Sequence, residues 1–181
     1  MKITLLADDA IRLEQDGDAA AIRGVHLAAF DTPSEAALVD ALREHGASIV
    51  SLVAVDADLI VGHILFSPIT VDGQDSQMLG LAPMAVRPER QRQGIGSALV
   101  RAGLEASRRR GAAAVVVVGH AAFYPRFGFA PASRFGLRCE YDVPDEVFMA
   151  LELVSGAILE NVQRAGKAGR LVRYHPAFAD L

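Results

Sequence analysis

The fold is decided by residues 79–118, which read "LGLAPMAVRPERQRQGIGSALVRAGLEASRRRGAAAVVVV". The run starts with an apolar stretch that predicts a strand over Leu79–Val86, and apolar residues at helical spacing predict a helix over Gly94–Arg110. Residues 112–118 are apolar without alternation, which is typical of a parallel strand covered by helices. The stretch therefore predicts a strand, a helix and a parallel strand, joined by a right-handed crossover.

Antiparallel strands are expected on either side of this unit. Residues 48–55 and 59–71 are apolar runs separated by a short polar joint, and Asp72-Gly73 marks the next turn. We predict a mixed α/β fold whose central sheet is mostly antiparallel and contains one parallel strand-helix-strand crossover. The other expected elements are a strand over 11–14, helices opening at Asp16 or Asp18 and at Pro33-Ser34, and strands within 136–143 and 146–154.

Length and composition indicate one domain. The 181 residues are 51% hydrophobic and 22% charged, which suits a single globular core. After Val154 the chain mixes glycines with polar residues, so residues 1–154 are expected to form the domain and residues 155–181 an extension packed on it. The C-terminal strands are candidates for a homodimer contact.

Charge and cysteine content exclude several classes of partner. The formal net charge of −4 and the pI near 5.7 argue against a nucleic-acid binder. A single cysteine, Cys139, rules out an internal disulfide framework and suits a reducing compartment. The first residues, "MKITLLADDAIRL", contain acids where a signal peptide needs an unbroken apolar core, and no segment has the length of a membrane span. A cytoplasmic protein without a membrane or nucleic-acid partner is expected.

The beginning of the helix at Gly94 is a candidate anion site. The first N–H groups of a helix have no internal partner and carry the positive end of its dipole. Gly94 and Gly96 allow close approach to the main chain, and Ser97 adds a hydroxyl donor. Three arginines are expected to surround this point with positive charge: Arg87, Arg90 and Arg92.

Two known phosphate loops fit this stretch poorly. A nucleoside-triphosphate loop needs a lysine after its last glycine, whereas Gly96 is followed by Ser97 and Ala98. A dinucleotide loop needs a third glycine where this chain has Leu99. A dinucleotide-dependent enzyme is therefore kept only as a less favoured hypothesis. A further interpretation of this stretch also stays open: a flexible, glycine-containing loop whose arginines lie in solvent and bind nothing.

Two motifs at a characteristic separation resemble the GCN5-related N-acetyltransferase (GNAT) superfamily. "QRQGIG" (91–96) is similar to the loop that holds the pyrophosphate of acetyl-coenzyme A in that superfamily, and "FYPRFGF" (123–129) is similar to its segment after the parallel strand. The phrases "GHILFSP", "YPRFGF" and "VRYHPAF" resemble a bacterial branch whose substrates are poorly defined. The resemblance implies the acyl-CoA N-acyltransferase fold over about 11–154, acetyl-CoA as co-substrate, and direct transfer to a primary amine of a small molecule or peptide.

The strand before the loop contains a change of phase. Leu79 and Leu81 share one face, Met84 and Val86 share the other, and Pro83 lies between them, which predicts a bulge near Pro83. An ordinary twisted edge strand remains the alternative. The resemblance implies main-chain contacts to the pantetheine arm and thioester from Met84, Ala85 and Val86. It also implies cofactor contacts from Gln91, Arg92, Gln93, Gly94, Ile95, Gly96, Ser97 and Phe123.

Tyr124 is the leading catalytic candidate. A phenol, with a reference pKa of about 10, keeps its proton at neutral pH and can protonate a departing thiolate. The resemblance places a general acid at this position, whereas the residues alone also allow an aromatic packed beside Phe123, Phe127 and Phe129. Two interpretations of Arg126 stay open: its side chain contacts the phosphates of the cofactor, or it lies in solvent.

A general base is harder to assign. Glu35 opens the second helix and could act through a water molecule, although a helix-opening glutamate also suits the dipole alone. We expect His63 to be a core histidine bonded to a main-chain group. The histidines show no spacing for a metal site.

The chain departs from the superfamily pattern before the tyrosine. It has Val117 and His120 where an asparagine and an alanine are common, and Pro125 follows Tyr124. The helix there is expected to be short or absent. A catalytically silent acetyl-CoA sensor remains the alternative to an enzyme.

Overall fold

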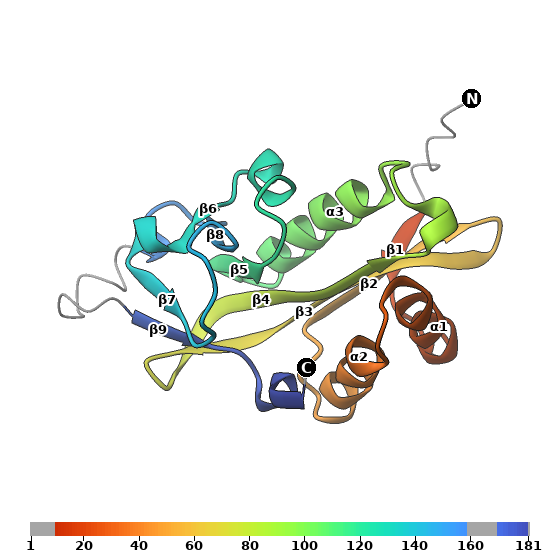
Figure 1. Ribbon diagram of the computed structural model, residues 1–181, viewed down its shortest axis with the longest axis horizontal. Helices are drawn as coiled ribbons and strands as arrows, with labels where there is room; N and C mark the ends of the chain where they lie inside the picture. The colour runs from red at the N-terminus through yellow and green to blue at the C-terminus, as the bar shows by residue number, and fades with distance from the viewer. Residues whose placement is uncertain (1–9, 159–169, 181) are drawn as a thin grey trace.

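The computed structural model describes residues 10–158 and 170–180, which form a sheet with helices on both faces (Figure 1). Helix α3 (Ile95–Arg109) covers one face, and α1 (Ala19–Ala29) and α2 (Ser34–Glu44) cover the other. The predicted mixed α/β class is confirmed. The strands are β1 (Ile11–Leu13), β2 (Val50–Asp56), β3 (Leu59–Val71), β4 (Gln74–Val86), β5 (Ala114–Val118), β6 (Ala130–Pro131), β7 (Leu137–Cys139), β8 (Phe148–Glu152) and β9 (Arg170–Arg173).

The strands pair in the order β1-β2-β3-β4-β5-β8-β6, and β9 joins β3 to β7. The predicted crossover is confirmed: β4 and β5 are parallel and α3 connects them. A second parallel pair, between β7 and β9, was not predicted, because the four residues of β9 lie in a stretch whose glycines and polar residues indicated an extension. Part of that extension, residues 159–169, lies outside the described residues, as do residues 1–9.

Strand β4 begins earlier than its hydrophobicity indicates. We expected it at Leu79, but it begins at Gln74, directly after the Asp72-Gly73 turn. Both turn residues have positive φ, 51° and 76°, which is the conformation of a two-residue hairpin turn. The turn places Gln74 opposite Val71, and the polar residues that follow pair at an exposed end of the sheet. Turn geometry, rather than hydrophobicity, fixes the start of this strand.

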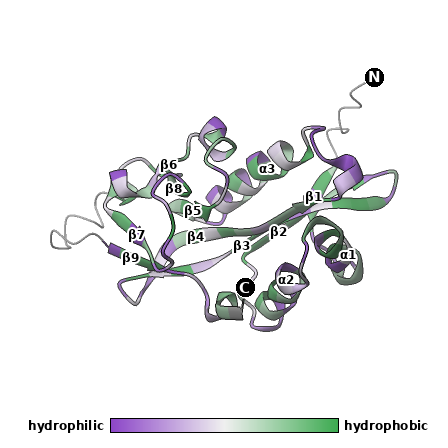
Figure 2. Ribbon diagram, viewed as in Figure 1, coloured by the Kyte–Doolittle hydropathy of each residue, from purple (hydrophilic) through white to green (hydrophobic). Residues whose placement is uncertain are grey.

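Helix α3 packs closely on the sheet. Ile95 and Leu99 are buried and Ala102 is partly buried, while Gly103 lies at the centre of the contact. A Cβ on Gly103 would come within 2.4 Å of the Phe66 ring, so its absence allows the helix to approach β3. Figure 2 shows hydrophobic residues along the central strands and polar ones in the turn η1 (Pro88–Arg90) that leads into α3. No helix of the described ranges is long and apolar enough to cross a membrane.

Candidate active site

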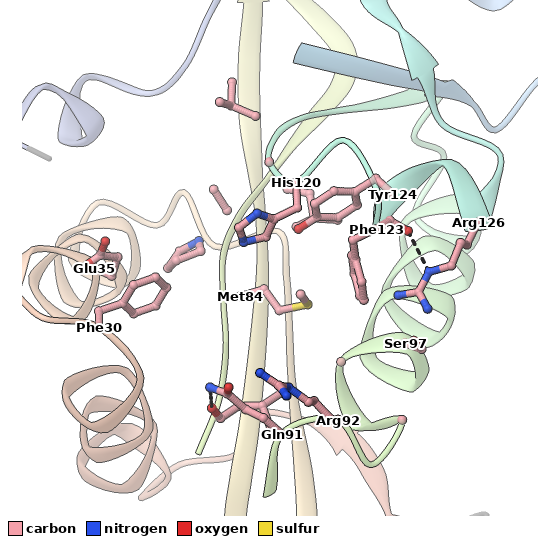
Figure 3. A pocket seen from close by; sticks show the side chains of 18 of the residues that line it. Phe30, Glu35, Met84, Gln91, Arg92, Ser97, His120, Phe123, Tyr124 and Arg126 are labelled. Atoms are coloured by element: carbon pink, nitrogen blue, oxygen red, sulfur yellow. Dashed lines mark hydrogen bonds between the residues drawn. The ribbon is translucent and has the colours of Figure 1, made fainter. Parts of the chain in front are cut away.

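A cavity of about 900 Å³ opens where β4 and β5 separate (Figure 3). Its α3 wall consists of Met84, Val86, Gln91, Arg92, Gly94, Gly96 and Ser97. Its α2 wall consists of Phe30, Glu35 and Leu38. The β5 turn, residues 119–127, closes a third side with Gly119, His120, Phe123, Tyr124 and Arg126.

The cavity exists because β4 loses one of its two neighbours. Parallel pairing with β5 ends at Gly80 opposite Val116, while pairing with β3 continues to Val86. Within the described residues, the β4 edge from Leu81 onward therefore has no strand beside it. Main-chain groups along that edge can bind an extended ligand, apart from the Val86 carbonyl, which accepts a hydrogen bond from the Gln91 side chain at 3.0 Å.

The predicted bulge in β4 is confirmed. Phe66 pairs with Leu81 and Ile64 pairs with Met84, so Ala82 and Pro83 together oppose a single residue of β3. The extra residue reverses the side-chain phase, which brings Met84 into the cavity. Ala85 faces the opposite side, where it is buried and lies opposite His63.

The first turn of α3 faces the cavity without a cap. Gly94 adopts a left-handed conformation with φ of 89°, and no side chain caps the helix. The first N–H groups of α3 therefore lack partners from the helix, as at any helix N-terminus. A Cβ on Gly96 would lie 3.8 Å from Met84, Val86 and Phe123, so glycine keeps the cavity wide at this point. The arrangement suits a phosphate group that approaches the main chain.

The arginines around this turn are less concentrated than the sequence indicated. Arg92 lines the cavity and is exposed, and within the described residues it forms no ion pair. Arg90 also lines the cavity, but it pairs with Asp56 at 2.6 Å. Arg87 does not line it, because its Nε donates to the Ile60 carbonyl at 3.2 Å. The prediction that all three arginines surround one point is therefore wrong.

Arg126 lies at the other side of the β5 turn. Its guanidinium stacks over the Phe123 ring, 4.5 Å from the centroid, and its Nε donates to the Phe123 carbonyl at 3.1 Å. These contacts hold the guanidinium at the rim of the cavity near Ser97 (Figure 3). A positive charge is therefore present on both sides of the α3 N-terminus.

Tyr124 is held firmly with its hydroxyl directed into the cavity (Figure 3). Its ring is 6% exposed and makes edge contacts with Phe123 and Phe129. Gly119 makes room for it, since a Cβ there would lie 2.4 Å from the Tyr124 ring. Burial raises the pKa of Tyr124 to about 12, so the hydroxyl keeps its proton throughout the neutral range.

The α2 wall carries a single carboxylate. Glu35 lies in the first turn of α2 and accepts a weak hydrogen bond from the Thr32 hydroxyl at 3.4 Å. Phe30 and Leu38 lie beside it and give this side of the cavity an apolar surface. The wall can therefore accept a ligand that combines a positive charge with an apolar part.

Behind the α2 wall, His63 does not bond to the main chain, so that prediction is wrong. Its Nδ1 lies 2.8 Å from Nε2 of His26, and its Nε2 lies 2.8 Å from the Ser51 hydroxyl, which in turn donates to Glu14. His26 is fully buried and its ring is stacked with that of Phe30. Burial lowers the pKa of His26 to about 4 and holds the pKa of His63 well below its ordinary value.

Most residues singled out from the sequence lie together in this cavity, and besides Arg87 three others do not line it. Ala85 and Ile95 are buried beneath its surface, and the Gln93 side chain donates to the Glu89 carbonyl at 3.2 Å. Sequence reasoning missed His120, although a position after the carboxyl end of a parallel strand is where α/β folds place ligands. The other lining residues that it missed are Phe30, Leu38, Leu81, Ala82, Pro83, Val118 and Gly119. In the described ranges, no group of three or more His, Cys, Asp or Glu could hold a metal ion.

Comparisons with known proteins point to one family. Residues 47–131 match the family described as acetyltransferase (GNAT) domain. The chain is 38% identical over 169 residues to the uncharacterized N-acetyltransferase YhbS of Escherichia coli K12, covering 93% of this chain and 97% of that protein. The crystal structure of YhbS from E. coli in complex with CoA gives a TM-score of 0.84 over 93% of this chain and 91% of that one. The structure of a GNAT family acetyltransferase from Brucella melitensis in complex with acetyl-CoA gives a TM-score of 0.74. It is 35% identical to this chain, and the match covers 93% of this chain and 96% of that one.

Proposed function

Because the chain belongs to the GNAT family of N-acetyltransferases, we propose that it transfers an acetyl group from acetyl-CoA directly to the primary amine of an acceptor. The observation that carries this proposal is one cavity in which an uncapped helix N-terminus and a protonated tyrosine face the same space. A small molecule or the end of a peptide can supply the amine.

The pyrophosphate of CoA is assigned to the start of α3. The main-chain N–H groups of residues 94–97 and the guanidinium of Arg92 supply donors and positive charge, and Arg126 adds charge from the opposite rim. The E. coli and B. melitensis relatives were solved with CoA and with acetyl-CoA, which supports this class of ligand. Gln91 is expected to shape the loop, since its side chain donates to the Val86 carbonyl at 3.0 Å.

The pantetheine arm and the thioester are assigned to the open edge of β4. An extended chain can pair with the main chain of Met84, Ala85 and Val86 where β5 has diverged. The buried side chains of Ile95 and Ala85 support this edge from below, so only the main chain of these two residues is proposed to meet the ligand. Phe123 and Met84 would flank the arm.

Tyr124 is proposed as the general acid. Transfer requires a proton for the departing sulfur, and a buried phenol that stays protonated can supply it. Glu35 is the carboxylate that meets the acceptor amine, directly or through a water molecule. Cys139 does not line the cavity, so it has no place in a covalent relay.

The whole chain is proposed to act as one unit. The core of residues 1–154 would hold the site, and residues 155–181 would pack on it as an extension. Support comes from β9, which pairs with both β3 and β7, and from Phe178, which is buried in the same core as β3.

The decisive experiment measures free thiol released from acetyl-CoA in the presence of a panel of primary amines. We expect amine-dependent release, and we expect Tyr124→Phe to lower kcat by about 100-fold or more without changing the CoA affinity measured by calorimetry. Tyr141→Phe, at a tyrosine that is 39% exposed and outside the cavity, is the matched control. A protein that binds CoA but releases thiol only at the background rate would instead be a sensor, and one that does not bind CoA would contradict the assignment altogether.

A further inference from the structure

The β5 turn brings a second proton-exchanging side chain to the same place as Tyr124. The Gly119 N–H donates to the Val147 carbonyl at 2.9 Å, and the Phe123 N–H donates to the His120 carbonyl at 2.9 Å. These bonds anchor the turn to the neighbouring segment and close it on itself. Figure 3 shows the His120 ring reaching into the cavity beside the hydroxyl end of Tyr124.

His120 also lines a second hollow beside the cavity. This shallower hollow of about 480 Å³ is lined by residues 118–122 and Val147, so it shares Val118, Gly119 and His120 with the main cavity. The His120 residue is exposed, and within the described residues its side chain makes no hydrogen bond. The imidazole is therefore accessible to a molecule in either hollow.

Few groups in the cavity can accept a proton near neutral pH. The charged or titratable side chains that share it with His120 are Glu35, Arg90, Arg92, Tyr124 and Arg126. Guanidinium groups stay protonated in proteins, and Tyr124 holds its own proton. An imidazole exchanges protons in this range and is the side chain most often used as a general base. The choice is therefore between His120 and Glu35.

We propose that His120 is the general base of the reaction and that Glu35 instead binds the positive charge of the acceptor. This inference rests on the proposed acetyl transfer. During transfer the amine nitrogen and the departing sulfur are bonded to the same carbon, so the base and the acid must lie close together. His120 lies beside Tyr124, whereas Glu35 and Phe30 lie on the opposite wall (Figure 3).

The proton and electron balance closes with these two groups. His120 takes one proton from the acceptor ammonium and passes it to solvent, which leaves a neutral amine. The nitrogen lone pair forms the C–N bond at the thioester carbonyl carbon, and the C–S bond then breaks with its electron pair on sulfur. Tyr124 gives its proton to that sulfur. His120 removes the second proton from nitrogen, and solvent returns one to the tyrosine, so one ammonium and one thioester yield an amide, a thiol and a free proton.

The test compares His120→Gln with Glu35→Gln and with His45→Gln, an exposed histidine outside the cavity. We expect the rate of the wild type to fall at acid pH, and we expect His120→Gln to lower kcat by about 100-fold and to abolish that fall. Glu35→Gln should raise the KM for the amine and still lose rate at acid pH (the acid limb of the pH–rate profile). His45→Gln should have the KM and the acid limb of the wild type. CoA affinity, measured by calorimetry, should be the same in all four proteins.

A readout independent of turnover completes the test. The imidazole NMR signals of His120, identified by their absence from His120→Gln, should shift when methylamine is added to the CoA complex, while those of the buried His26 and His63 should not. An undiminished kcat in His120→Gln, or an acid limb that persists there, would overturn this inference and leave the proposed function intact. A wild type that neither binds CoA nor releases thiol would overturn both.

Discussion

The α3 wall and the α2 wall of the cavity are built in different ways. The α3 wall offers mainly backbone groups: the open edge of β4 and the first turn of α3, where Gly96 has no side chain to block the ligand. The α2 wall offers side chains: Glu35 and Leu38 from α2, and Phe30, the residue that follows α1. A backbone site can hold the same cofactor in many family members, whereas a side-chain wall can change with each acceptor.

The supports behind the two walls differ as well. The α3 wall rests on apolar packing between α3 and the sheet. The α2 wall rests partly on a polar chain in which His26 contacts His63, His63 contacts Ser51, and Ser51 contacts Glu14. The buried histidines make the second support sensitive to acid, whereas in the described residues α3 packs on the sheet through apolar contacts.

The largest expected difference between the two walls is their stability at acid pH. The pKa of His26 lies at about 4 in the folded protein and near 6.5 when unfolded, so the folded state binds fewer protons between those values. Its contribution is complete above pH 6.5 and is lost as the pH falls toward 4, which lowers the free energy of unfolding by about 3 kcal/mol. Urea unfolding at a series of pH values measures this loss.

Its control is His26→Gln, which removes the titrating ring. The variant should lose much of the slope of stability against pH in that window. Hydrogen exchange at pH 5 should increase in α1 before it increases in α3. Equal slopes for the two proteins would show that the histidine pair does not set the acid sensitivity of the α2 wall.

Next in size is the effect of Gly119→Ala on the β5 turn. The added methyl group would lie 2.4 Å from the Tyr124 ring and must push the ring aside. A displacement of roughly 1 Å at the reacting group costs about 100-fold in kcat. Steady-state thiol release should show this loss with little change in CoA affinity. Gly24→Ala, where the methyl group would meet only the Arg87 guanidinium at 3.6 Å, should leave kcat unchanged.

The sequence predicted the α3 wall well because its information is local. "QRQGIG" specifies a turn and a helix start within one short segment, and hydrophobic periodicity places α3 and β5. The same reasoning did not show that the side chains of Ala85 and Ile95 are buried beneath the cavity. Alternate residues of a strand, and residues on the inner face of a helix, point away from a ligand, so a contiguous run cannot line a cavity throughout.

The α2 wall and the histidine pair could not be predicted in this way. His26 and His63 meet only because α1 packs on β3, and their positions in the sequence show no relation. His120 was visible in the sequence, but only the β5 turn reveals that its ring and the Tyr124 hydroxyl share one cavity. Contacts between distant segments depend on the packing of whole elements, which local patterns do not encode.

A smaller effect is expected from Arg92→Glu on the α3 wall. Arg92 is an unpaired cation of that wall within the described residues, and reversal of its charge places a carboxylate beside the proposed pyrophosphate site. We expect CoA to bind about 30-fold more weakly, with a weaker dependence of affinity on salt than in the wild type. Calorimetry at low and high salt measures both. The matched control is Arg134→Glu, an exposed arginine outside the cavity, and equal CoA affinities for the two variants would contradict the pyrophosphate assignment.

The smallest expected effect belongs to Glu35→Gln on the α2 wall. A partly exposed carboxylate gains little from an ion pair with a cation, so its loss should raise the KM for the amine by about fivefold and leave kcat and CoA affinity almost unchanged. Glu44→Gln, at the exposed far end of the same helix, should change none of these values. Neutral acceptor analogues should bind both proteins equally. If Glu35→Gln instead lowered kcat and left KM alone, the α2 wall would take part in the chemistry, and the division of labour between the two walls would be wrong.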